Sequence, residues 1–307
     1  MADEKELIEK LVREEVRALS AYHVPAASGY IKLDAMENPH QWPESMVREW
    51  QELLAHAAVN RYPDPAAKDL TQSLRKVMEI PEEMGTILGN GSDELIQVLA
   101  QTLASPERAI MAPTPSFVMY QMIATFVDMD FVGVPLKEDF SLDIDVMLDV
   151  IKREQPALIF LAYPNNPTGN LFNDSDIEKI LETAEGVVVV DEAYHAFAEK
   201  SFMPMLKEYD NLLVMRTVSK MGLAGLRLGL LAGKAEWLNE FDKVRLPYNI
   251  NILTQASAEF AIKNRHVLDK QTEQICVDRE VLFKELSQIE SITPYPSQAN
   301  FILVRVG

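Results

Sequence analysis

The sequence predicts an α/β protein in which a mainly parallel sheet of seven strands lies between helices and a smaller α+β domain follows. Short apolar runs, most of them rich in leucine or β-branched residues, recur along the first two thirds of the chain. Segments of helical periodicity separate several of these runs, which is typical of a parallel sheet covered on both faces. Near residue 247 the pattern changes to long helices, which favours a second unit.

Each expected strand is an apolar run that is too short for a buried helix and is bounded by turn residues. The seven runs lie at 86–88, 108–111, 131–134, 157–161, 187–190, 212–215 and 228–232. Helical patterns lie between them at 93–103, 143–153 and 174–185.

Further elements are expected on both sides of this alternation. A charged helix at 4–19, an extended arm at 31–33 and a helix from 65 to about 78 precede the sheet. Two helices and a strand follow it, at 252–262, 267–290 and 301–304.

A chain of 307 residues exceeds the roughly 150 that one domain commonly needs. We therefore divide it into an N-terminal arm with part of the smaller domain, a large domain and a smaller C-terminal domain, at 1–45, 46–245 and 246–307.

Charge and cysteine content restrict the function. The chain has 47 acidic against 29 basic residues, a net charge of -18, which repels nucleic acid and anionic lipid. The single cysteine, Cys276, excludes an internal disulfide, and one cysteine with five scattered histidines disfavours a metal cluster. The N-terminus has no secretory signal pattern, and no apolar stretch reaches the length of a membrane span, so we expect a cytoplasmic protein.

Ligands of a parallel sheet bind beyond the C-terminal ends of its strands, so the residues after each run are the candidates for chemistry. The segment 89–94 reads Gly-Asn-Gly-Ser-Asp-Glu and opens a helix, which makes Ser92 and Asp93 part of a candidate anion cup. An ordinary helix cap explains these two residues equally well. The segment matches neither a Walker A loop nor a Gly-x-Gly-x-x-Gly turn, which disfavours a dinucleotide-binding dehydrogenase.

Two more strand ends carry polar residues. A turn at 163–169 places Asn166 between prolines, although a plain structural turn is an equally good interpretation. The run at 187–190 ends on Asp191, with Tyr194 shortly after it. A carboxylate at the mouth of a buried strand needs a cation or a hydrogen-bond donor, and its position favours function over a capping role.

The densest candidate segment follows the run at 212–215. Within twelve residues it holds Thr217, Ser219, Lys220 and Arg227. A lone lysine is usually a surface charge, but hydroxyl groups, small apolar residues and a neighbouring arginine favour an amine with a lowered pKa. One ligand needs a lysine, a carboxylate and an anion cradle together: pyridoxal 5'-phosphate, whose aldehyde, ring nitrogen and phosphate they would meet.

These motifs together resemble the fold type I pyridoxal-phosphate aminotransferases of class II, most closely their histidinol-phosphate branch. The resemblance runs from Tyr22 to the end of the chain. The cofactor motifs are Asn-Pro-Thr-Gly at 166–169, Asp191-x-x-Tyr194, Ser219-Lys220 and Gly225-Leu-Arg227. The branch is indicated by the segments at 33–39, 61–65 and 299–302.

The resemblance implies catalytic roles for three residues. Lys220 would attach to the cofactor and then move a proton between substrate and cofactor carbons. Asp191 would pair with the ring nitrogen, and Tyr194 with Asn166 would bond the phenolic oxygen. Phe117 would stack on the ring. The phosphate would be held by Ser92, Asp93, Thr217, Ser219 and Arg227.

Partners and substrates are implied in the same way. Tyr62 would reach the cofactor of a second subunit, which implies a homodimer with shared sites, and Tyr22 and Asn38 would lie near the substrate. The strand at 301–304 would be internal to the smaller domain, so we expect that domain to be incomplete at Gly307.

The implied reaction moves an amino group between L-histidinol phosphate and 2-oxoglutarate, in histidine biosynthesis. Phosphothreonine decarboxylation and an aromatic or broad-specificity transamination remain open, because they share the cofactor motifs. A cofactor-binding module without turnover is disfavoured, because binding alone does not require the full set of residues.

Overall fold

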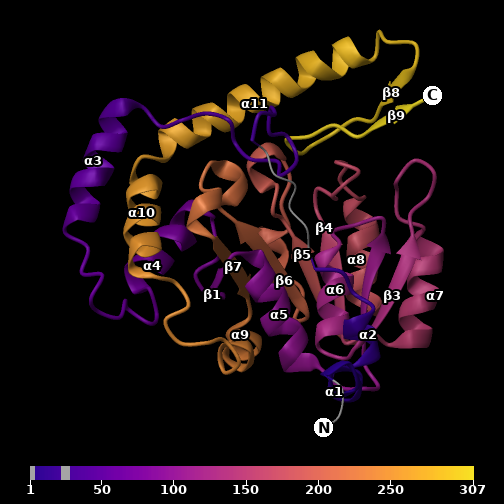
Figure 1. Ribbon diagram of the computed structural model, residues 1–307. Coiled ribbons are helices and arrows are strands. Elements are labelled where there is room, and N and C mark those ends of the chain that lie inside the picture. Colours follow the sequence, from indigo (N-terminus) through magenta and orange to yellow (C-terminus); the bar gives the residue numbers. More distant parts are fainter. Residues whose placement is uncertain (1–3, 22–27) are drawn as a thin grey trace.

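A seven-stranded sheet in the order β1-β7-β6-β5-β4-β2-β3 forms the centre of the molecule (Figure 1). The computed structural model describes residues 4–21 and 28–307. The strands are β1 (Gly85–Asn90), β2 (Ala109–Thr114), β3 (Asp130–Pro135), β4 (Leu158–Ala162), β5 (Val187–Asp191), β6 (Leu212–Thr217) and β7 (Leu228–Gly233). Strand β7 runs antiparallel to its neighbours β1 and β6, and the other pairs are parallel. The predicted α/β fold with a mainly parallel sheet is confirmed.

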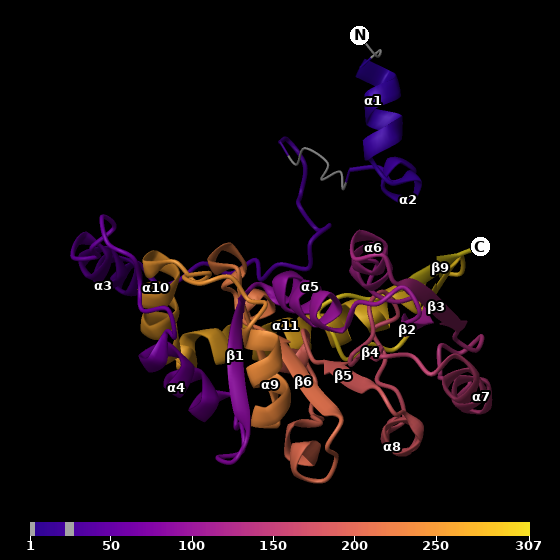
Figure 2. The ribbon, with the colours of Figure 1, turned by 90° about the horizontal axis from the view of Figure 1, so that it is seen from below.

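Alternating side chains of the strands enter two separate cores, because successive residues of a strand point to opposite faces. In β5, Val188 and Val190 pack in one core and Val187 and Val189 in the other. Helices α4 (Lys68–Val77), α7 (Ile144–Glu154) and α8 (Asp174–Thr183) cover the first face, and α5 (Ser92–Leu103), α6 (Met119–Phe126) and α9 (Ala235–Asp242) the second. Figure 2 views this layered arrangement from below.

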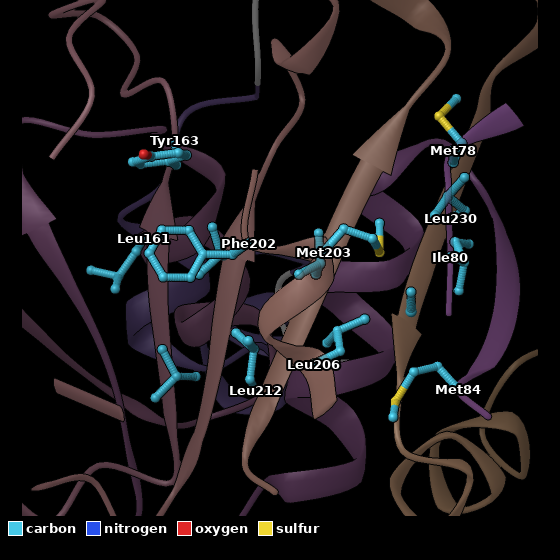
Figure 3. Close-up of a cluster of buried hydrophobic side chains, with 14 of the residues drawn as sticks. Met78, Ile80, Met84, Leu161, Tyr163, Phe202, Met203, Leu206, Leu212 and Leu230 are labelled. Atoms are coloured by element: carbon cyan, nitrogen blue, oxygen red, sulfur yellow. The ribbon is translucent and has the colours of Figure 1, made fainter. Parts of the chain in front are cut away.

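The core on the first face extends from the sheet to the loop after β5 (Figure 3). Phe202 packs its ring edge-on against Tyr163, with the ring centroids 5.3 Å apart. Met203 and Leu206, from a short 3₁₀ helix at Met203–Lys207, join this core with β6 residue Leu212. Full burial of each such side chain contributes about 1.5–3 kcal/mol, which fixes the loop that follows β5 against the sheet.

The remaining elements lie around this sheet. They are α1 (Glu4–Leu11), α2 (Glu14–Arg17), α3 (Glu44–Ala55), α10 (Ile252–Lys263), α11 (Arg265–Leu286), β8 (Ile292–Pro294) and β9 (Val304–Val306). Helix α11 crosses above the sheet, and the β8–β9 hairpin extends beside it (Figure 1). Within the described ranges, no helix is both long and apolar enough to cross a membrane. The division at 45/46 and 245/246 stays a prediction.

Several predicted elements differ in extent, and two of them make a contact distant in sequence where they differ. The helix expected at 4–19 is broken at Arg13, whose backbone is extended and whose guanidinium donates to the carbonyls of Thr125 and Phe126 at 2.8 and 2.9 Å. The strand expected at 301–304 begins at Val304, and the ring of Phe301, which lies before it, packs edge-on against Tyr194.

Gly229 in β7 lies where another backbone passes very close. A Cβ atom there would be 2.8 Å from the carbonyl carbon of Gly91 and the nitrogen of Ser92. We expect Gly229→Ala to lower the free energy of unfolding by about 1–3 kcal/mol, because overpacked sites must shift backbone. Gly225→Ala is the matched control, since its Cβ meets nothing within 4 Å. Urea unfolding of both variants measures the change in the free energy of unfolding. Equal midpoints would contradict the close approach of the Gly91–Ser92 backbone to Gly229.

Candidate active site

The functional candidates converge because of strand direction. Strands β1, β2, β4, β5 and β6 all end at the same edge of the sheet, and the antiparallel β7 begins there. Residues that follow these five parallel strands therefore meet at one edge, together with Arg227, which directly precedes β7.

One cavity of about 460 Å³ lies at this edge. It brings together ten residues that the sequence singled out: Ser92, Asp93, Phe117, Asn166, Asp191, Tyr194, Thr217, Ser219, Lys220 and Arg227. Further lining comes from Asp34, Ala35 and Met36 of the N-terminal arm, and from Ser116 and Tyr120 after β2.

Lys220 lies in a short 3₁₀ helix (Ser219–Met221) directly after β6, with its amine inside the cavity. Its Nζ donates to the carbonyl of Ala35 at 2.8 Å and stands 5.6 Å from the ring centre of Tyr194. Burial lowers the pKa of the Lys220 ammonium group below its usual value of 10.5; Glu37 opposes this and Arg227 adds to it. A lysine with a lowered pKa has more neutral amine and is a better nucleophile.

Asp191 is the last residue of β5 and is 4% exposed. Its Oδ2 accepts a hydrogen bond from the Tyr120 hydroxyl at 2.7 Å, and its Oδ1 accepts one from the Ala193 N–H at 3.1 Å. Burial raises the pKa of the Asp191 carboxyl to about 6, against the opposing effect of these two donors. The carboxylate is therefore mainly ionised at neutral pH and is available to a cationic ligand atom.

The side chains of Asn166 and Tyr194 lie next to one another in the cavity lining. The Asn166 Nδ2 donates to the Tyr194 hydroxyl at 3.1 Å. Burial raises the pKa of Tyr194 above its usual range, so the phenol stays protonated and remains a donor. The pair thus presents an amide and a hydroxyl group to one ligand atom.

The hydroxyl and guanidinium groups form a cluster suited to an anion. The Oγ atoms of Thr217 and Ser219 are 2.8 Å apart, and Thr217 also donates to the Leu228 carbonyl at 3.0 Å. The Arg227 Nη2 donates to the Asp93 Oδ2 at 3.1 Å, and both residues line the cavity. The first N–H groups of α5 lie beside this cluster, and unpaired N–H groups at a helix N-terminus attract anions.

Three predicted residues lie apart from this lining. Tyr22 is outside the described residues. Tyr62 is 80% exposed and stacks on Tyr248 with ring centres 4.6 Å apart. Asn38 lines a neighbouring cavity of about 440 Å³, where its Nδ2 donates to Gln271 at 3.1 Å.

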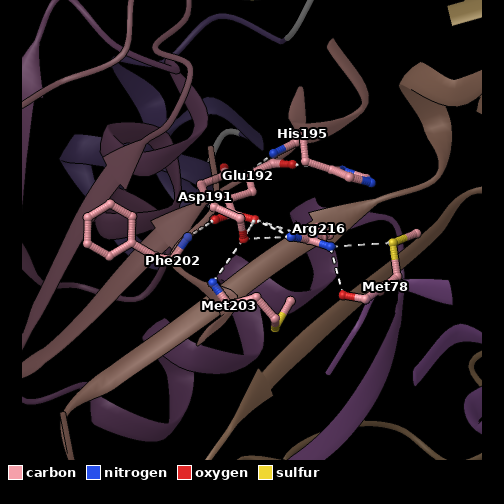
Figure 4. A network of polar contacts seen from close by, with 9 residues as sticks. Met78, Asp191, Glu192, His195, Phe202, Met203 and Arg216 are labelled. Atoms are coloured by element: carbon pink, nitrogen blue, oxygen red, sulfur yellow. Dashed lines mark hydrogen bonds and ion pairs between the residues drawn. The ribbon is translucent and has the colours of Figure 1, made fainter. Parts of the chain in front are cut away.

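A buried ion pair lies behind the cavity and joins the ends of β5 and β6 (Figure 4). Arg216 contacts Glu192 through Nε at 2.8 Å and Nη2 at 2.7 Å, and both residues are buried. Arg216 also donates to the Met78 carbonyl at 2.9 Å and to Ser201 at 2.7 Å, while the Phe202 N–H donates to Glu192 at 2.6 Å. Each residue of the pair directly adjoins a cavity residue, Asp191 or Thr217.

Tyr120 is a lining residue that sequence reasoning missed, because the helix that carries it was not among the expected elements. The available signal was position: Phe117 and Tyr120 follow β2 at a spacing of three, which brings both to one side of a helical turn. The Glu192–Arg216 pair was also missed, although both residues lie within two positions of the end of an expected strand.

The comparisons with known proteins agree with this geometry. Residues 28–307 match the family model described as aminotransferase class I and II. This chain belongs to that aminotransferase family. Two similar relatives are histidinol-phosphate aminotransferase 2 of Nitrosococcus oceani, 53% identical over 98% of this chain and 84% of that protein, and its namesake of Cupriavidus pinatubonensis, 50% identical over 98% and 83%.

A solved aminotransferase supports the fold. The histidinol-phosphate aminotransferase of Sinorhizobium meliloti, in complex with pyridoxal-5'-phosphate, superposes with a TM-score of 0.80 at 24% identity and covers 89% of this chain and 75% of its own. The predicted fold type I architecture and aminotransferase membership are therefore confirmed.

The buried ion pair gives a stability prediction. We expect Arg216→Met to lower the free energy of unfolding by about 3–5 kcal/mol, because it leaves the Glu192 carboxylate buried without its partner. The matched control is Arg48→Met, which breaks an exposed ion pair with Glu44 and should change the free energy of unfolding by less than about 1 kcal/mol. Urea unfolding at neutral pH compares them, and similar losses would show that the buried pair does not join the strand ends.

Proposed function

We propose that this chain binds pyridoxal 5'-phosphate and transfers an amino group between L-histidinol phosphate and 2-oxoglutarate in histidine biosynthesis. The observation that carries the proposal is the Lys220 amine, with a lowered pKa, in one cavity with Asp191, Asn166 and Tyr194. Relatives that share half of the residues over nearly the whole chain bear the name of this reaction, which supports the substrate.

The donor set fits this cofactor. An aldehyde needs an amine, which Lys220 supplies, and a pyridine nitrogen needs a carboxylate to hold its proton, which Asp191 supplies. A phosphate needs hydroxyl groups, N–H groups and a positive charge, which Thr217, Ser219 and Arg227 supply together with the start of α5. Phe117 offers an apolar ring face in the same cavity.

When bound, the cofactor supplies an electron sink for the carbanion that forms when the substrate loses a proton. Lys220 is the group that takes and returns this proton at Nζ, and burial favours the neutral amine that can accept it. Asp191 holds a proton on the ring nitrogen, since its carboxylate is mainly ionised above pH 6. Asn166 and Tyr194 would donate to the phenolic oxygen of the cofactor.

A homodimer with shared sites completes the proposal. Tyr62 does not line the cavity of its own chain and is 80% exposed, which leaves it free to serve the cavity of a second copy. Val59 and Leu246 are about as exposed, at 70% and 71%, which supports an apolar contact surface near Tyr62 and Tyr248. Roles for Tyr22 and Asn38 near the substrate, and a cytoplasmic location, stay predictions.

Covalent labelling tests the lysine. Borohydride reduction of the chain saturated with pyridoxal 5'-phosphate should fix about one cofactor per chain, on the peptide that contains Lys220. Lys220→Ala should abolish the label, whereas Lys234→Ala, which removes a lysine that pairs with Asp210 outside the cavity, should retain it. Peptide mass spectrometry locates the label, and its presence on another lysine would contradict the assignment.

Substrate specificity tests the reaction. With 2-oxoglutarate as acceptor, L-histidinol phosphate should give glutamate with a kcat/KM at least about tenfold above histidinol, because charge-assisted hydrogen bonds to a phosphate contribute about 1.5–3 kcal/mol each. Phenylalanine and phosphothreonine serve as competing substrates. Glutamate is quantified together with released CO₂. Faster turnover of phenylalanine, or CO₂ from phosphothreonine, would replace the proposed substrate and leave the cofactor assignment standing.

A further inference from the structure

Tyr120 of α6 connects two residues of the proposed cofactor site. Its side chain is fully buried, with the ring stacked on Phe160 at a centroid distance of 4.5 Å and an interplanar angle of 2°. Phe117 meets the same ring edge-on at 5.5 Å. The Tyr120 hydroxyl donates to the Asp191 Oδ2 at 2.7 Å. One rigid aromatic side chain thus supports the residue proposed to stack on the cofactor ring and the residue proposed to pair with its nitrogen.

The Asp191 carboxylate is held on both oxygens by donors from its own chain. The Ala193 N–H occupies one lone pair of Oδ1, and the Tyr120 hydroxyl occupies one lone pair of Oδ2. Each oxygen keeps a second lone pair for a ligand. Because one donor lies in the segment directly after β5 and the other in α6, they fix the plane of the carboxylate as well as its position.

We propose that Tyr120 is a positioning residue that keeps Asp191 charged and aimed into the cavity and holds the Phe117 ring in place. This inference rests on the function proposed above, because it concerns the same cofactor. Tyr120 acts through Asp191 and Phe117.

The negative charges around Asp191 oppose its ionisation, and the Tyr120 hydroxyl counteracts them. Asp93, at the start of α5, and the adjacent Glu192 are negative and oppose ionisation of Asp191, as does burial. Lys220 and Arg227 line the same cavity, and Tyr194 faces it with a protonated phenol. The hydrogen bond from Tyr120 lowers the pKa of Asp191, whereas the charges of Asp93 and Glu192 raise it toward about 6. Burial raises the pKa of Tyr120 itself far above 10, so its hydroxyl remains a donor across the working pH range.

The test uses a pair of matched variants. Tyr120→Phe removes one hydroxyl and retains the ring that stacks on Phe160. Tyr163→Phe is the control: Tyr163 is equally buried, and its hydroxyl donates to the Asp174 Oδ1 at 2.6 Å, away from the cavity. Both variants lose a tyrosine–aspartate hydrogen bond, which is buried for Tyr120 and partly buried for Tyr163, so a general effect of losing such a bond appears in both.

We expect Tyr120→Phe to weaken pyridoxal 5'-phosphate binding about tenfold, since losing one hydrogen bond to a charged group commonly corresponds to a factor of about ten or more. The pH midpoint of the visible absorption of the bound cofactor should also move, because that midpoint depends on the charge held at the ring nitrogen. Tyr163→Phe should leave both quantities unchanged. A Tyr120→Phe chain that folds and matches the unaltered chain in both would overturn the proposal.

A second measurement needs no cofactor. A carboxyl whose folded pKa is raised stabilises the fold at low pH, and this contribution is lost as pH rises from about 4 to about 6. In cofactor-free chains, Tyr120→Phe should raise the pKa of Asp191 further, because the protonated carboxyl is then favoured more. The stability that Asp191 contributes at low pH should therefore be lost over a range that reaches to higher pH.

The extension should vanish when Asp191→Asn is also present, whereas Tyr163→Phe should show no such coupling. Urea unfolding at several pH values measures this cycle. Independence of Tyr120→Phe and Asp191→Asn would overturn the inference. Failure of the unaltered chain to bind the cofactor, with the coupling intact, would instead overturn the proposed function.

Discussion

The site depends on the buried ion pair between Glu192 and Arg216, because this pair fixes the ends of β5 and β6 against one another. Successive strand residues point to opposite faces. Glu192 and Arg216 therefore anchor one face of the sheet, beside Met78 and Phe202, while the adjacent Asp191 and Thr217 are presented on the other (Figure 4).

Burying two charges costs free energy, which an ion pair offsets only when its remaining donors and acceptors are satisfied. Here the Met78 carbonyl, the Ser201 hydroxyl and the Phe202 N–H complete the contacts. The Ser201–Phe202 loop is itself held by the apolar core on that face (Figure 3). Hydrophobic packing thus makes the ion pair tolerable, and the ion pair in turn sets the spacing of the cavity residues.

The sequence predicted most of the site because parallel topology determines where strand ends meet. Once the runs ending near Asn90, Ala162, Asp191 and Thr217 are recognised as parallel strands, their following residues must share an edge. The antiparallel direction of β7 brings Arg227 there too, and nothing in its local sequence indicates that direction. The break at Arg13 and the hydrogen bond from Tyr120 were equally hidden, because each depends on a partner about 70 or more residues away.

Opposing factors determine whether the Lys220 amine is charged or neutral. The Ala35 carbonyl and the face of the Tyr194 ring both favour the charged ammonium group, while burial and Arg227 favour the neutral amine. The Ala35 carbonyl belongs to the N-terminal arm, so the position of the arm around residue 35 helps to set the balance between the ammonium group and the neutral amine of Lys220.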